Sequence, residues 1–176
     1  MGYLLTTADC LLTLMSDLPK PIKDLVAPIF EARPLAKAMS RLVVTEREST
    51  PLVEEVDRII QYPALNNCPP LVAGLWLYVD QLDASHKISQ QIDDATGSFW
   101  HGIMHRREGD FSNSHYWFRR VGHHPAMAAI DVPGGYDDHA LIDQVEQAHR
   151  QGQAPASLIE CQRREWMALF HYCATT

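Results

Sequence analysis

Apolar residues along the chain recur mainly every three or four positions, and no segment of useful length alternates with period two. The longest apolar stripe lies between Leu71 and Ile92. At about 100° per residue, one side of a helix there collects five apolar residues and then three polar ones. The apolar members are Val72, Leu75, Trp76, Val79 and Leu82, and the polar ones are Asp83, His86 and Gln90. The pattern predicts an all-α fold, an irregular multi-helix single domain over residues 1–176.

Prolines, glycines and capping residues divide the chain into segments of helical length. Four prolines punctuate residues 1–34, which we therefore expect to form an irregular N-terminal region before a helix from Leu35 to Thr45. Thr50 followed by Pro51 predicts an N-cap with proline in the first helical turn. Further helices are expected from Leu52 to Gln61, Leu71 to Ile92, Ser98 to Arg107, Ser112 to Val121, Asp137 to Arg150 and Ser157 to Cys173.

Composition limits the classes of partner. A chain of 176 residues, 46% of them hydrophobic, is long enough for one substantial core. Its 15 basic and 22 acidic residues give a net charge of −7, which argues against nucleic acid as a partner. No apolar run approaches about 18 residues, so we expect no membrane partner. The cysteines form no CxxC pair and favour reduced thiols in a cytoplasmic protein; they are Cys10, Cys68, Cys161 and Cys173.

Histidines are concentrated between positions 86 and 124, where six of the nine lie. His101, His105 and Glu108 stand at i, i+4 and i+7, so their directions on a helix agree within about 60°. Imidazole and carboxylate groups are ligands for a divalent metal ion such as zinc. We therefore predict a metal site of His86, His101, His105 and Glu108. The sequence lacks the glutamate of an HExxH zincin motif after His101.

Two other interpretations of these residues stay open. His101, His105 and Glu108 are also suited to acid–base catalysis without a metal. Alternatively, His86 is a core histidine hydrogen-bonded to Asp83, and the other histidines are ordinary residues of a helix surface.

Two arginine pairs, Arg106-Arg107 and Arg119-Arg120, stand out in an acidic chain. Guanidinium groups form forked hydrogen bonds to phosphate or carboxylate, and aromatic rings nearby can stack on a planar ligand. The residues predicted to bind a small anionic molecule are Arg107, Tyr116, Trp117, Arg119 and Arg120. The alternatives are salt bridges for at least one arginine of each pair, and core positions for the two aromatic residues.

The segment Ser98–Asp110, read SFWHGIMHRREGD, continues through YWFRRVG at Tyr116–Gly122 to Pro125. This string resembles the hallmark of a family of uncharacterised proteins. The resemblance covers about Leu75 to Pro125. It implies a shared site and brings no activity, cofactor or fold with it.

Three functions follow as hypotheses. The first is a small-molecule enzyme that uses the His/Glu residues, with or without a metal, on an anionic substrate. The second is a non-catalytic module that binds an anionic metabolite or nucleotide through the Arg/aromatic segment. The third is a structural or oligomerisation domain, in which the same segment forms a hydrogen-bonded core or a homo-oligomer interface.

Overall fold

The computed structural model describes residues 15–46 and 50–176. This part of the chain is all-α, with ten helices and no strand. Cys10 lies outside the described residues, and the other three cysteines are free. The helices are α2 (Lys20–Ala32), α3 (Pro51–Ile59), α4 (Pro63–Asn66), α5 (Pro69–Tyr78), α6 (Leu82–Ser89), α7 (Ala95–Glu108), α8 (Phe111–Val121), the short 3-10 helix η1 (Pro125–Ala129), α9 (Asp138–Arg150) and α10 (Ala156–Thr175).

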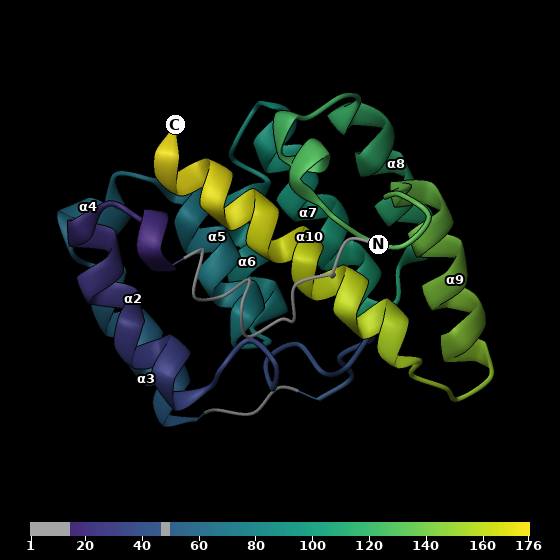
Figure 1. The fold of residues 1–176 in the computed structure, drawn as a ribbon, viewed down its shortest axis with the longest axis horizontal. Helices are drawn as coiled ribbons and strands as arrows, with labels where there is room; N and C mark the ends of the chain where they lie inside the picture. The colour runs from purple at the N-terminus through teal and green to yellow at the C-terminus, as the bar shows by residue number, and fades with distance from the viewer. Residues whose placement is uncertain (1–14, 47–49) are drawn as a thin grey trace, which may run out of the picture.

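Helix α5 forms the centre of the structure. All of its residues from Leu71 to Tyr78 are buried, so it has no polar face. It packs against α6, α7 and α10 as well as the shorter α3 and α4. Figure 1 shows α10, in yellow, crossing in front of α5, α6 and α7, with α2 and α3 on one side and α8 and α9 on the other. The helices expected to begin at Thr50-Pro51 and at Asp137 do so, because both residues cap them with a side-chain oxygen.

The prediction of an irregular N-terminal region is wrong for residues 20–32. They form α2, with Pro21 in the first turn, where a missing N–H costs nothing. Pro28 lies inside the helix and removes one backbone hydrogen bond. An apolar face of Ile22, Val26, Ile29 and Phe30 is buried and offsets that loss.

The helix expected from Leu35 to Thr45 is absent, and turns take its place. The backbone carbonyls there accept hydrogen bonds from distant side chains instead of from their own helix. Gln162 donates to Met39 O at 2.9 Å and Arg163 donates to Ala38 O at 2.9 Å. Met39 also has a positive φ of 47°, which an α-helix does not allow.

The single helix expected over Leu71 to Ile92 is divided into α5 and α6. Asp80 lies at the corner with a positive φ of 63°. Three arginines surround its carboxylate, and the closest is Arg107, at 2.6 Å. An ion pair made across the fold therefore stabilises a backbone conformation that ends the helix, and local spacing could not reveal it.

Candidate metal centre

Helix α7 carries the two histidines that were predicted to share one side. Its start is set by Asp94, whose carboxylate accepts from the Gly97 amide at 2.9 Å. Its end is set by Gly109, in the left-handed conformation at φ 87°. Between these caps the i, i+4 spacing holds, and the rings of His101 and His105 stack with centroids 4.8 Å apart. Both side chains are buried in the α6–α8 side of the fold.

His86 reaches this pair from α6, and the corner at Asp80 brings it there. Arg107 of α7 donates to the Leu77 carbonyl at 2.8 Å and to Asp80 at 2.6 Å. These bonds tie the end of α5 and the start of α6 to α7. The ring of His86 consequently lies 4.6 Å from that of His101 and 5.5 Å from that of His105, edge-on to both.

The three histidines lie close enough together to bind one metal ion. One nitrogen from each lies within 4.8 Å of the other two. Tetrahedral ligation at about 2.0–2.1 Å places histidine nitrogens about 3.3 Å apart, so a bound zinc ion would draw together any nitrogens that lie farther apart than this. We call His86, His101 and His105 the histidine triad. Of the four predicted metal ligands, the structure brings these three together.

The electrostatic state of His101 suits a metal ligand. Burial, together with the neighbouring His105 and His86, lowers the pKa of His101 to about 3. The ring is therefore neutral at physiological pH and carries a free lone pair. Its Nδ1 atom is buried and has no hydrogen-bond partner in the described part of the chain. Such an unpaired buried group costs about 1–3 kcal/mol, a cost that a ligand at this nitrogen would remove.

Glu108 lies behind His105. Its Oε1 atom is 2.6 Å from His105 Nδ1. A carboxylate that accepts the Nδ1 proton orients the ring and leaves the Nε2 lone pair available, which is the usual environment of a metal-ligating histidine. Glu108 also lies near Asp110, in a second group with His105. Both oxygens of Asp110, however, accept hydrogen bonds from Asn113, so the triad offers the better ligand set.

Arg107 does not reach the surface. Its side chain has no exposed area, and its two terminal nitrogens donate to Asp80, to Leu77 O and to Arg41 O. The structure therefore favours the salt-bridge alternative for Arg107 over the predicted role in holding an anion. Its ion-pair partner Asp80 was missed, although the polar pair Asp80-Gln81 interrupts the apolar run and could have indicated a helix end.

The aromatic residues of α8 adjoin the triad. Trp117 stacks on His101 with ring centroids 4.0 Å apart and planes 21° from parallel. The guanidinium of Arg120 lies 5.3 Å from the Trp117 ring and 6.0 Å from the Tyr116 ring. Tyr116 is 45% exposed, so it is not a core residue. The predicted Arg/aromatic surface and the histidines therefore meet through Trp117.

Arg119 lies apart from these residues. It is exposed and lines a wide hollow of about 780 Å³ between the end of α8 and the start of α9. Its neighbours along that hollow include Phe118, His123 and His139. Of the predicted anion-binding residues, only Tyr116, Trp117 and Arg120 are grouped next to the triad.

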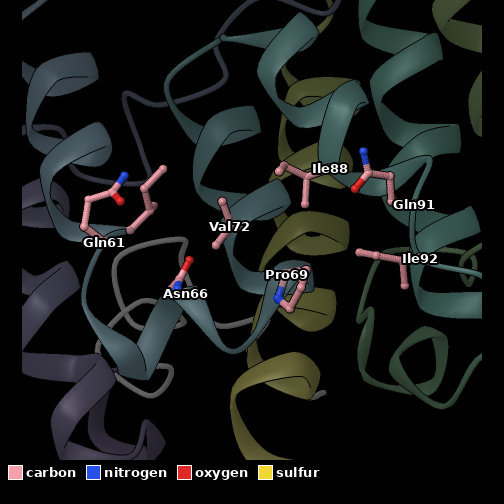
Figure 2. Close-up of a pocket in the computed structure, with 8 residues that line it drawn as sticks. Gln61, Asn66, Pro69, Val72, Ile88, Gln91 and Ile92 are labelled. Carbon is pink, nitrogen blue, oxygen red and sulfur yellow. The ribbon is translucent and has the colours of Figure 1, made fainter.

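A separate pocket of about 330 Å³ lies among α3, α4, α5 and α6 (Figure 2). Ile88 of α6 lines it, two residues after His86. The lining carries no titratable side chain, so this pocket offers no acid, base or metal ligand. Its other residues are Ile60, Gln61, Asn66, Pro69, Val72, Gln91 and Ile92.

No model of a known protein family, no curated protein and no solved structure matches this chain. Among the described residues, no helix combines the length and the apolar character needed to cross a membrane.

Proposed function

We propose that the protein is a metal-dependent enzyme acting on a small anionic molecule. The histidine triad holds a divalent cation of the zinc type, and Glu108 orients His105. Two observations carry the proposal: three imidazole nitrogens from two helices lie within 4.8 Å of one another, and His101 Nδ1 is buried without a hydrogen-bond partner among the described residues.

Three histidine ligands are typical of a catalytic zinc site, where the fourth position takes water or substrate. A cation in such a site activates water as a nucleophile and polarises a substrate oxygen. His101 supplies a neutral imidazole for this purpose, because burial keeps its pKa low. Glu108 is a partly exposed carboxylate beside His105, and it would accept a proton from substrate or water.

The anionic character of the substrate is inferred from Arg120. Its guanidinium lies over Trp117, whose other neighbour is His101. Among the described residues, Arg120 forms no ion pair with a carboxylate, so its hydrogen-bond donors remain available to a ligand. A phosphate or carboxylate bound there would lie next to the triad.

Metal analysis of the purified protein tests the cation site. We expect about one equivalent of zinc or a similar ion, lost in His101→Ala and in His105→Ala. The matched control is His123→Ala, which removes an exposed histidine outside the triad. Glu108→Gln should weaken zinc binding about 10- to 100-fold because it removes the orienting carboxylate. Retention of the metal by folded His101→Ala protein would contradict the proposal.

A second candidate function is anion binding without catalysis, and the stacking of Arg120 on Trp117 favours it. A thermal-shift screen of phosphorylated and carboxylated metabolites separates the two functions. Stabilisation by an anion that Arg120→Ala abolishes, in a protein that binds no metal, would support the binding module. The enzyme requires the metal as well as the anion.

A further inference from the structure

His115 of α8 and His139 of α9 form a second pair of histidines, whose side chains face one another. They lie on the side of α8 opposite Trp117. His115 Nδ1 lies 2.6 Å from His139 Nδ1. Their rings are nearly parallel, with centroids 4.9 Å apart and planes at 12°. The two residues are 24 positions apart in the sequence, so only the packing of α8 against α9 brings them together.

The contact between two Nδ1 atoms has a chemical requirement. Two imidazole lone pairs repel one another at this distance, so one ring donates an N–H to the other unless a cation replaces that proton. A cation bonded at about 2.0–2.1 Å would move the two nitrogens apart to about 3 Å or more. Asp143 restricts the choice, because its Oδ1 atom lies 3.0 Å from His115 Nε2. A neutral His115 that donates its Nε2 proton to Asp143 directs the Nδ1 lone pair at His139.

Asp143 lies against a ring nitrogen of His115, just as Glu108 lies against a ring nitrogen of His105. A histidine whose far nitrogen donates to a carboxylate is typical of a metal ligand. We propose that His115 and His139 form a second cation site, in which water completes the coordination. Two imidazoles without a thiolate favour ions in the order of Cu²⁺ above Ni²⁺ and Zn²⁺.

The surroundings allow a cation to reach this pair. His139 lines the hollow of about 780 Å³, and so do the carboxylates of Asp137 and Asp138. Arg119 and His123 line the same hollow and are its other charged or titratable side chains beside Tyr136. His115 itself is 24% exposed at its side chain. The site shares no residue with the triad, so it is independent of the proposed function.

Copper titration of the full chain tests the second site, with calorimetry for stoichiometry and electron paramagnetic resonance for nitrogen coordination. We expect His139→Asn and His115→Asn each to lose one equivalent of Cu²⁺ while the triad keeps its own. Asp143→Asn, at an exposed position, should weaken that binding about 10- to 100-fold. His149→Asn, an exposed histidine on the same helix α9, is the control and should bind as the wild type does.

The copper titration distinguishes the failure of the triad from the failure of the second site. If the triad binds no metal, His101→Ala changes nothing and His139→Asn abolishes copper binding. If His115 and His139 share only a proton, His101→Ala removes all copper binding, and His139→Asn and Asp143→Asn titrate as the wild type does. That second result would overturn the proposal.

Discussion

Helices α7 and α8 follow one another, and each has two consecutive arginines in its last turn, yet the two pairs have opposite environments. Arg106 and Arg107 have no exposed area, whereas Arg119 and Arg120 are exposed. Arg106 forms a forked ion pair with the fully buried Glu165, one arm of which measures 3.0 Å. The exposed pair has no such carboxylate among the described residues. Identical dipeptides thus form a buried ion-pair network in one helix and lie exposed in the other.

The difference arises from what surrounds each helix. Helix α7 is covered by α5 and α6 as well as by α8, so nearly every residue of it is buried. Helix α8 has one apolar face, and its other face meets solvent. The two approach closely at Gly102, where an added Cβ would lie 2.7 Å from the Phe118 ring. Burial of a charge is tolerated only with a partner, which α10 and the α5–α6 corner supply to α7.

The largest effect is expected at the buried pair. Arg106→Met should lower the free energy of unfolding by about 3–5 kcal/mol, because it leaves the Glu165 carboxylate buried without its counter-ion. Urea denaturation measures the loss. A triple variant that also carries Glu165→Leu and Tyr136→Phe removes the carboxylate together with both of its hydrogen-bonding partners and should recover much of the stability. If Arg106→Met lowers the free energy of unfolding by less than about 1 kcal/mol, the buried ion pair does not distinguish α7 from α8 in stability.

A smaller loss of stability is expected for Arg107→Lys. The lysine keeps the positive charge but cannot form both guanidinium hydrogen bonds, one to Asp80 and one to Leu77 O. The free energy of unfolding should fall by about 1–3 kcal/mol. Because the same two hydrogen bonds position α6, nuclear Overhauser contacts between the rings of His86 and His101 should weaken. If those contacts persist at full strength, the corner is held by Arg33 and Arg41 instead.

In the metal-free protein, His101 of the buried helix α7 should account for most of the loss of stability at low pH. The pKa of His101 is lowered to about 3 in the folded state, against an ordinary value of 6.5. The unfolded chain therefore binds a proton below pH 6.5 that the folded chain does not, and stability falls as the pH drops from 6.5 towards 3. The loss from this residue is at most about 1.4 kcal/mol per pH unit.

Urea denaturation in the presence of a chelator, repeated at several pH values, measures that slope. His101→Gln removes the titrating ring and should flatten the profile between pH 6 and 4, while His123→Ala on the exposed segment after α8 serves as the control. An unchanged slope in His101→Gln would assign the acid sensitivity to other groups.

The smallest effect on stability is expected for the exposed pair. Arg119→Ala and Arg120→Ala should each change the free energy of unfolding by no more than about 0.5 kcal/mol. They should differ in binding, because only Arg120 lies over Trp117 beside the triad. Stabilisation by phosphate or a carboxylate, measured by thermal shift, should disappear in Arg120→Ala and persist in Arg119→Ala. If the thermal shift is the same in the two variants, the anion does not bind beside the triad.

Local signals in the sequence determined the helical class, several helix starts and the common side of His101 and His105. Caps and hydrophobic spacing act over one or two turns, so they can be recognised without knowledge of the fold. Thr50 and Asp137 illustrate this, since each accepts a hydrogen bond from an amide three residues ahead. The residues between such signals were predicted less well, as α2 and the turns of residues 35–45 show.

Tertiary packing alone decided which charged and aromatic residues are brought together. Asp80 ends α5 because Arg107 reaches it across 27 positions, and that corner delivers His86 to the triad. Trp117 stacks on His101, and His139 meets His115, because α8 packs between α7 and α9. These contacts depend on how whole helices pack, which no short stretch of sequence encodes. The sequence by itself therefore determined the candidate ligands, and the packing of α6, α7 and α8 determined which of them converge.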